Sequence, residues 1–188
     1  MRFAGKIAVV TGAASGIGKA AVLKLAREGA HVFAADIDEA GGQALAEQSN
    51  GKIDFVRCDV TKPADIEALM NSAAAKAGGI DIVFNNAAAA GDRAPIDEIS
   101  PEGWDRTMDL VLKSVAMGIR YAAPHMKGRK GASIVNTASV AALGAGYSPI
   151  AYAVAKAGVL HLSKVAATDL ARYGIRVNAV CPRFINTN

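Results

Sequence analysis

The sequence contains few cysteines and few aromatic residues. Two of its 188 residues are cysteines, Cys58 and Cys181, and only 5% are aromatic. Neither cysteine has a histidine or a second cysteine at the spacing of a metal site, and the three histidines are isolated from one another. The sequence therefore gives no evidence for a metal, and we expect both cysteines to be free thiols at the ends of buried strands.

The sequence contains no cluster of like-charged residues and no long apolar run. Lysines and arginines number 21 against 17 aspartates and glutamates, a net charge of +4, and they are scattered. This scattered balance argues against a nucleic-acid partner. No apolar stretch reaches the length of a membrane span, and Met1 to Lys6 lack a signal-peptide core. We therefore expect a cytoplasmic protein with no membrane partner.

Short β-branched segments alternate along the chain with longer alanine-rich segments of helical period. The expected strands are residues 7–11, 31–36, 53–59, 82–85, 133–138 and 176–180. The expected helices are residues 17–28, 39–48, 63–77, 101–123 and 149–173. This alternation predicts an α/β fold, a doubly wound parallel Rossmann sheet of about six strands with helices on both faces. We expect residues 1–188 to form one domain, with a ligand at the carboxyl ends of the strands.

A glycine-rich turn joins the first expected strand to the first helix. It holds Gly12, Gly16 and Gly18, with Ser15 and Ile17 between them. Small residues let the backbone approach phosphate oxygens, and the helix N-terminus supplies amide donors, so the turn suits a dinucleotide pyrophosphate. The alternative is a tight strand-to-helix turn that binds nothing.

Asp36 ends the second expected strand, at the distance from the turn where a carboxylate accepts hydrogen bonds from the adenosine ribose. Its charge would repel the 2′-phosphate of NADP. Ile37 follows it and Ser15, not arginine, precedes Gly16, so no neighbour compensates a phosphate. This favours NAD, although an ordinary solvated aspartate at a strand end is the alternative.

Tyr152 and Lys156 stand four residues apart on the last expected helix, and Ser139 lies upstream of them. A spacing of four places both side chains on one helix face, where an ammonium lowers the pKa of a phenol. Tyrosine can then exchange a proton with a reacting oxygen that the Ser139 hydroxyl holds. The alternative is a surface tyrosine–lysine pair without catalytic use.

Taken together, these motifs resemble those of the short-chain dehydrogenase/reductase family. The matching segments are residues 11–18, Asp59-Val60, residues 85–87, Ser139, residues 152–156 and residues 178–182. The resemblance implies that Asp59 and Val60 flank the adenine, and that Asn86, Ala87 and Thr187 contact the cofactor. It also implies catalysis by Ser139, Tyr152 and Lys156, with Tyr152 as acid/base and Lys156 also on the nicotinamide ribose.

Four features depart from the family pattern. Ala88 replaces a glycine, a minor change. Val111 replaces an asparagine that holds a water for proton relay, so we expect slow turnover unless another group serves. Arg183 replaces a glycine beside the nicotinamide, where it obstructs the cleft, contacts the pyrophosphate or swings into solvent. The sequence given also stops at Asn188, before the substrate-covering segment and last strand that the resemblance leads us to expect.

The functional prediction is an NAD-dependent oxidoreductase that interconverts a secondary alcohol and its ketone. The loops 87–91 and 140–147 carry no cation, so we expect an uncharged, hydrophobic substrate. The alternative is a family member that binds NAD with weak or no catalysis, because of Val111, Arg183 and the short C-terminus. An NADP-dependent acyl reductase is disfavoured by Asp36. The resemblance implies a homo-oligomer, a dimer or tetramer packed through the two long helices, and we expect the dimer.

Overall fold

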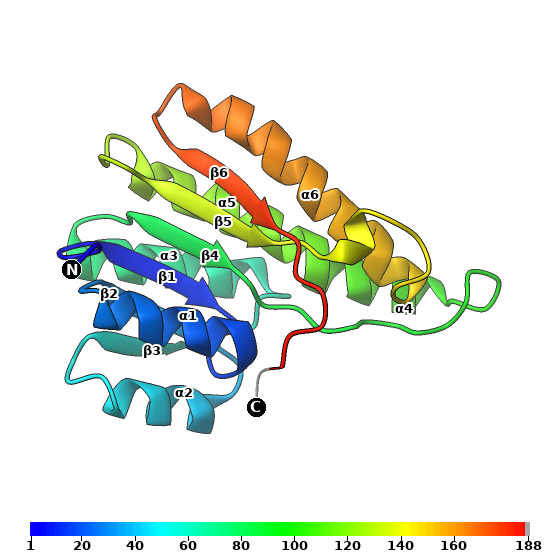
Figure 1. The fold of residues 1–188 in the computed structure, drawn as a ribbon, viewed down its shortest axis with the longest axis horizontal. Coiled ribbons are helices and arrows are strands. Elements are labelled where there is room, and N and C mark those ends of the chain that lie inside the picture. Colours follow the sequence, from blue (N-terminus) through cyan, green and yellow to red (C-terminus); the bar gives the residue numbers. More distant parts are fainter. Residues whose placement is uncertain (187–188) are drawn as a thin grey trace.

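The computed structural model describes residues 1–186 and contains one six-stranded parallel sheet with helices packed against it (Figure 1). The strands are β1 (Ile7–Thr11), β2 (His31–Asp36), β3 (Ile53–Arg57), β4 (Ile82–Asn85), β5 (Ser133–Thr137) and β6 (Arg176–Val180). The helices are α1 (Gly16–Arg27), α2 (Glu39–Glu47), α3 (Pro63–Ala77), α4 (Pro101–Met108), α5 (Ser114–Met126) and α6 (Ile150–Ala171). The expected Rossmann architecture is confirmed.

The strand order is β3-β2-β1-β4-β5-β6, so the chain winds outward from β1 in one direction and then from β4 in the other. Every pair is parallel, and the register places Thr11 opposite Ala35 and Asn85 opposite Asn136. All six strands therefore end at the same edge of the sheet. The order reverses between β1 and β4, which is where ligands of such sheets bind.

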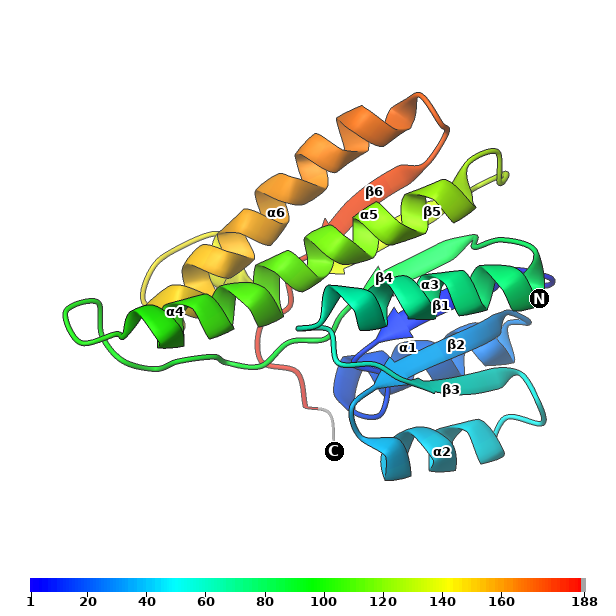
Figure 2. The ribbon, with the colours of Figure 1, turned by 180° about the vertical axis from the view of Figure 1, so that it is seen from behind.

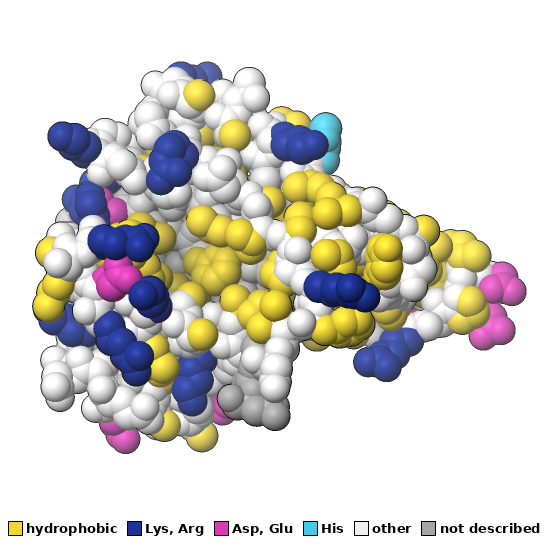
Figure 3. All heavy atoms as spheres, in the orientation of Figure 1, with side chains coloured by type: hydrophobic (Ala, Val, Ile, Leu, Met, Phe, Trp, Pro, Cys, Tyr) yellow, Lys and Arg dark blue, Asp and Glu magenta, His cyan; other side chains and the backbone are white. Residues whose placement is uncertain are grey.

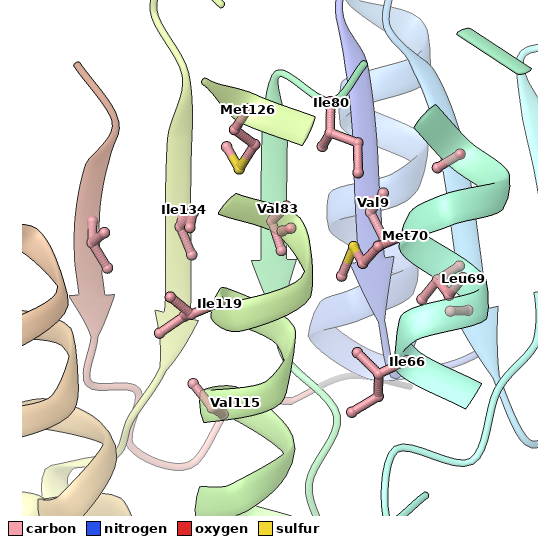
Figure 4. Packing of buried hydrophobic residues seen from close by; sticks show 14 of the residues in the cluster. Val9, Ile66, Leu69, Met70, Ile80, Val83, Val115, Ile119, Met126 and Ile134 are labelled. Atoms are coloured by element: carbon pink, nitrogen blue, oxygen red, sulfur yellow. The ribbon is translucent and has the colours of Figure 1, made fainter. Parts of the chain in front are cut away.

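One face of the sheet is covered by α3, α5 and α6, which pack over β1, β4, β5 and β6 (Figure 2). Val9, Val83 and Ile134 project from three adjacent strands into this layer. They meet Met70 of α3 and Ile119 of α5, and each of these side chains is at most 7% exposed (Figure 4). This larger core fixes the helices that carry the catalytic candidates.

The opposite face is covered by α1 and α2 over β1, β2 and β3, around Val10, Val22 and Leu45. Among the described residues, no helix covers β4, β5 and β6 on this side, and β6 is an edge strand (Figure 1). Apolar side chains gather over the middle of this face in the space-filling view (Figure 3). Helices on both faces are therefore present, but on this face they cover only half of the sheet.

The long helix expected over residues 101–123 is interrupted. α4 gives way to a π-helical segment, Asp109–Lys113, before α5 begins at Ser114 and continues to Met126. The extra residue of a π turn cannot be detected from apolar periodicity, because the pattern on either side remains helical. Val111 lies in this turn and is fully buried.

The helix α6 corrects one expectation about membranes. It has 22 residues, and an 18-residue window within it has a mean hydropathy of 1.2, so it is long and apolar enough to cross a membrane by length and composition alone. However, α6 packs against β5, β6 and the π-helical segment, and buries Ala151, Ala155 and Val159 there. It is a core helix of this fold.

Candidate active site

The glycine turn is packed so tightly that two of its glycines have no room for a side chain. A Cβ on Gly18 would lie 1.9 Å from the carbonyl oxygen of Gly12, and one on Gly12 would lie 2.8 Å from the Ala87 Cα. Gly12 and Gly16 also have positive φ values of 65° and 55°. The sequence at the turn is thus fixed by backbone contact between β1, α1 and the segment after β4.

The start of α1 presents backbone amide donors that no side chain caps. Ser15 is the N-cap residue in an extended conformation, but its side chain accepts no capping hydrogen bond, and the first turn contains no acidic residue. Ser15, Gly16 and Ile17 line a large cleft at this end of the sheet. A helix N-terminus that keeps its positive end toward a cleft suits a pyrophosphate, and the residues present therefore fit a dinucleotide.

Asp36 ties the glycine turn to the end of β2. Its two carboxylate oxygens accept hydrogen bonds from Ala14 N (2.9 Å) and Asp38 N (3.1 Å). Each oxygen keeps a further lone pair, so Asp36, which lines the cleft, can still accept from ribose hydroxyls. Arg57 of β3 lies opposite Asp36 in the sheet. This neighbouring cation was not predicted from the sequence. Arg57 is paired with Glu39 at 2.8 Å and does not line the cleft.

Asp59 and Val60 line the cleft just after β3. The side chain of Thr61 donates to Asp59 Oδ1 at 2.7 Å, and this hydrogen bond holds the pKa of Asp59 below its usual value. Cys58, also in the lining, is buried, and this burial raises the pKa of its thiol to about 12. It is an unreactive free thiol, as expected, while Cys181 is only partly buried.

Asn86 joins the ends of three strands. Its amide nitrogen donates to the carbonyls of Thr11 (3.1 Å) and Gly12 (3.3 Å), and its Oδ1 accepts from Thr137 Oγ1 (3.2 Å). The Thr11 hydroxyl in turn accepts from the backbone amides of Asn86 and Ala87. Asn86 lines the cleft, but its side chain is engaged in bracing the cleft floor.

Tyr152 and Lys156 face the far end of the same cleft from the first two turns of α6. The ammonium of Lys156 is buried, donates to the Thr137 carbonyl and lies 5.5 Å from the centre of the Tyr152 ring. Burial lowers the pKa of Lys156 to about 8. Burial likewise raises the pKa of Tyr152, and the hydrogen bond with the Ser139 hydroxyl opposes this shift. Burial therefore acts on the Tyr152 pKa in the direction opposite to the lowering expected from a nearby lysine.

Two hollows meet at Tyr152. The cofactor-side cleft has a volume of about 650 Å³ and extends from the glycine turn to Lys156. A second hollow of about 510 Å³, here called the substrate hollow, is lined by Ser139 and Tyr152 together with residues of three loops. Ala88 and Arg183 line both. A hydride and a proton can thus be exchanged at the junction between two separate binding volumes.

The structure brings most of the predicted site residues together. Those that line the cofactor-side cleft are Gly12, Ser15, Gly16, Ile17, Asp36, Asp59, Val60, Asn86, Ala87, Tyr152 and Lys156. Ser139 lines the substrate hollow, where its Oγ accepts from Ala141 N at 3.1 Å. Gly18 packs behind the turn, and Thr187 lies outside the described residues.

Several supporting residues were missed from the sequence. Buried polar groups link β4, β5 and α6: Asn85 Nδ2 donates to Asn136 Oδ1, and Asn136 Nδ2 donates to Ser163 Oγ, each at 2.9 Å. Arg93, on the loop before α4, lines the substrate hollow. The polar residues within the apolar strands β4 and β5 could have indicated a buried hydrogen-bond network. The position of Arg93 depends on the path of its loop, which the sequence does not reveal.

A sequence profile of the family described as short chain dehydrogenase matches residues 6–188, almost the whole chain. The chain belongs to the short-chain dehydrogenase family. The 2,5-dichloro-2,5-cyclohexadiene-1,4-diol dehydrogenase of Sphingobium indicum is 40% identical over 185 residues, covering 97% of this chain and 74% of that protein. The cyclohexanol dehydrogenase of an Acinetobacter species is 36% identical over 189 residues, covering 99% of this chain and 75% of that protein.

A crystal structure of a short-chain dehydrogenase/reductase from Burkholderia xenovorans superimposes with a TM-score of 0.90 at 33% identity, covering 98% of this chain and 77% of that one. The chain spans between 55% and 75% of the lengths of its curated relatives. Membership of the family supports an oxidoreductase that uses a nicotinamide dinucleotide, NAD or NADP, and acts on CH–OH groups.

Proposed function

We propose that this short-chain dehydrogenase is an NAD-dependent enzyme that interconverts a hydrophobic secondary alcohol and its ketone, with Tyr152 as acid/base. One observation carries the proposal. Ser139, Tyr152 and Lys156 converge where the cofactor-side cleft meets the substrate hollow. Such a convergence is needed only if a proton and a hydride are exchanged at that junction.

Bound NAD supplies the hydride acceptor. The Ser139 hydroxyl holds the substrate oxygen in the substrate hollow, and the Tyr152 phenolic oxygen takes the proton from that oxygen during oxidation or returns it during reduction. The Lys156 ammonium, fixed by the Thr137 carbonyl, holds a positive charge below the tyrosine ring and presents its remaining donors to the cofactor-side cleft. Ser139 therefore positions the substrate oxygen, Tyr152 transfers the proton, and Lys156 binds the cofactor and orients Tyr152.

Preference for NAD over NADP follows from Asp36. Its carboxylate lines the cleft and would repel a 2′-phosphate, while the neighbouring Arg57 is already paired with Glu39. Gly12, Gly16 and the start of α1 hold the pyrophosphate, and Asp59 and Val60 flank the adenine.

The substrate hollow suits a compact apolar molecule of ring size. Ala88, Ala89, Ala90, Val140 and Phe184 contribute apolar walls, and about 510 Å³ lies within the range of small-molecule sites. Relatives named for the dehydrogenation of cyclohexanol and of a dichlorocyclohexadienediol support a cyclic alcohol. The loops 87–91 and 140–147, on which the expectation of an uncharged substrate rests, carry no cation, whereas Arg93 and Arg183 also line the hollow.

A second candidate function is NAD binding with weak or no catalysis. Val111 is fully buried and its side chain cannot hydrogen-bond, so it offers no proton relay toward Lys156. Arg183 lines both hollows and can obstruct their junction. A Val111→Asn variant separates the two candidates, because its turnover exceeds that of the unsubstituted chain only where relay limits the rate.

The proposal is tested by mixing the chain with NAD and a panel of cyclic secondary alcohols, and following NADH by its absorbance. NADH binding is measured in parallel by fluorescence. Turnover with NAD exceeding that with NADP supports the proposal. NADH binding without turnover on any alcohol supports the second candidate, and absence of both contradicts the cofactor assignment.

We also propose that the protein is cytoplasmic and assembles as a homo-oligomer through α4, α5 and α6, as the family resemblance implies. Val154 and Val165 of α6 are each 46% exposed, which leaves apolar surface for such a contact. Light scattering of the chain and of a Val165→Glu variant tests this, since a monomer in both cases contradicts it.

A further inference from the structure

We propose that the substrate carries an anionic group, a carboxylate, away from its hydroxyl, and that Arg93 and Arg183 bind it. This inference rests on the proposed dehydrogenase function and adds the chemical class of its substrate. Three features make the substrate hollow electropositive. They are the two arginines, the lack of acidic residues among the described residues that line it, and the nearby N-terminus of α6.

The substrate hollow has a reactive end defined by Ser139 and Tyr152. The rest of its lining consists of small apolar residues, Tyr147, Ser148, Pro149, Phe184 and the two arginines. No acidic residue of the described chain lines it. A guanidinium group in an otherwise apolar hollow offers five donors and no acceptor, so its natural ligand there is an anion.

Arg183 lies between the two hollows, because it lines both together with Phe184. No aspartate or glutamate among residues 1–186 lies within ion-pair distance of its guanidinium, and the side chain is exposed. Its charge is therefore not neutralised by the part of the chain that the structure describes. A ligand bound beside Tyr152 would be the nearest partner for it.

Arg93 approaches from the loop between β4 and α4, while its acidic neighbour turns away. The Asp92 carboxylate accepts from Ala94 N at 2.8 Å and lies 4.0 Å from Arg106 Nη2. It also packs against the first turn of α4, where a Cβ on Gly103 would meet Asp92 Oδ2 at 2.2 Å. Asp92 is thus engaged with α4, and the charge of Arg93 on the hollow is not cancelled by it.

The N-terminus of α6 adds a third positive contribution. The helix begins at Ile150, directly after Ser148 and Pro149, which line the hollow. Its first turn contains no acidic residue, and the N-cap residue makes no side-chain hydrogen bond. The positive end of the helix therefore reinforces the field of the two arginines instead of being compensated.

A carboxylate matches these features better than a neutral group does. The planar guanidinium fork binds a carboxylate through two parallel hydrogen bonds, a geometry that a neutral hydroxyl or carbonyl group cannot reproduce. The small volume favours a ring or short chain that places the acid opposite the carbinol carbon. The competing assignment for Arg183 is a contact with the cofactor pyrophosphate, which the experiment below distinguishes.

The test compares two substrates that differ by one carboxylate, cis-4-hydroxycyclohexanecarboxylate and cyclohexanol, with NAD and the chain or its Arg93→Gln and Arg183→Gln variants. We expect each variant to raise KM for the hydroxy acid about tenfold and to lower kcat/KM for the hydroxy acid about tenfold more than kcat/KM for cyclohexanol. An Arg172→Gln variant, whose arginine stacks on Tyr173 far from the hollow, should change neither. Equal loss for both substrates, or no loss for the acid, overturns the proposal.

A second measurement does not need turnover. Cyclohexanecarboxylate is titrated into the NADH complex, and its binding is followed by NADH fluorescence and by calorimetry. We expect binding that weakens about tenfold in either arginine variant and at high salt, with NADH affinity unchanged. Carboxylate binding without alcohol turnover would sink the dehydrogenase proposal but keep the anion site. Loss of NADH affinity in Arg183→Gln would assign that arginine to the cofactor and overturn its role here.

Discussion

Lys156 donates a hydrogen bond from its buried ammonium to the backbone carbonyl of Thr137, and so links the second turn of α6 to the last residue of β5. The bond fixes the ammonium 5.5 Å from the centre of the Tyr152 ring. A charge buried at this position is unfavourable for folding, because desolvation opposes its protonated form. The buried Lys156 ammonium therefore lowers the stability of the fold, which indicates that it is kept for function.

The first prediction concerns Lys156→Met. The folded-state pKa of Lys156 is about 8, below the ordinary lysine pKa of 10.5, so the unfolded chain binds more protons between these pH values. Stability of the unsubstituted chain therefore rises as pH rises through this window. At pH 7 the buried charge costs at most about 3 kcal/mol, and the lost hydrogen bond returns about 1–2 kcal/mol of this. We expect the variant to be more stable by about 1–2 kcal/mol at pH 7.

Urea unfolding at pH 7 and near pH 10.5 measures this difference. The advantage of Lys156→Met should largely disappear near pH 10.5, where the lysine is neutral in the folded chain and only about half protonated in the unfolded chain. Lys164→Met, a substitution on the exposed side of α6, provides the control and should show no such pH dependence. A variant that is less stable than the unsubstituted chain at pH 7 would contradict the account.

Ser139→Ala tests how the tyrosine is tuned. The Ser139 hydrogen bond opposes the rise in the Tyr152 pKa that burial causes. Its removal should move the pH profile of kcat/KM for alcohol oxidation to higher pH, since oxidation needs the deprotonated phenol. It should also lower kcat roughly a hundredfold, through loss of the hydroxyl that holds the substrate oxygen. Ser148→Ala is the matched control, because Ser148 lines the same hollow and bonds only to the Pro149 carbonyl.

Gly18→Ala tests the packing of the cofactor turn. The added methyl would lie 1.9 Å from the Gly12 carbonyl oxygen and 2.8 Å from Asn86 Nδ2, so the turn must move. We expect a loss of stability of about 1–3 kcal/mol and a marked loss of NADH affinity. Gly144→Ala, which meets only the Tyr147 ring, should retain NADH binding. Fluorescence titration gives the comparison, and equal NADH affinity in both variants would refute the assigned role of the turn.

Asp36→Asn tests the cofactor preference. Asparagine keeps an acceptor for Ala14 N but removes the charge that repels a 2′-phosphate. The ratio of kcat/KM for NAD to that for NADP should fall by about tenfold or more, in line with loss of a charged determinant. Asp38→Asn removes a nearby charge that does not line the cleft and should leave the ratio unchanged. An unaltered ratio in Asp36→Asn would place the determinant elsewhere.

Much of the fold was predictable because buried parallel strands are continuous apolar runs. Strands β1, β2, β4 and β6 match their expected bounds, and α3 matches at both ends. The π turn around Val111 escaped prediction, since it adds one residue within an unbroken helical pattern. The helix α5 continues through Pro124 to Met126, three residues beyond the end expected at residue 123.

The site was predictable where chemistry is carried by residues at fixed spacing, as for the glycine turn and for Tyr152 and Lys156. The site was less predictable where a property of a side chain depends on its burial or on the path of a loop. Burial opposes the expected lowering of the Tyr152 pKa, and only the loop path brings Arg93 to the substrate hollow. Neither desolvation nor loop geometry is visible in residue spacing.

The most direct test of the account is Tyr152→Phe. The substitution keeps the ring that packs near Lys156 and removes only the hydroxyl. NADH production from a cyclic secondary alcohol should fall by a factor of about a hundred or more, while NADH binding by fluorescence stays within twofold. Undiminished turnover in the variant, with NADH binding intact, would contradict the assignment of Tyr152 as the group that moves the proton.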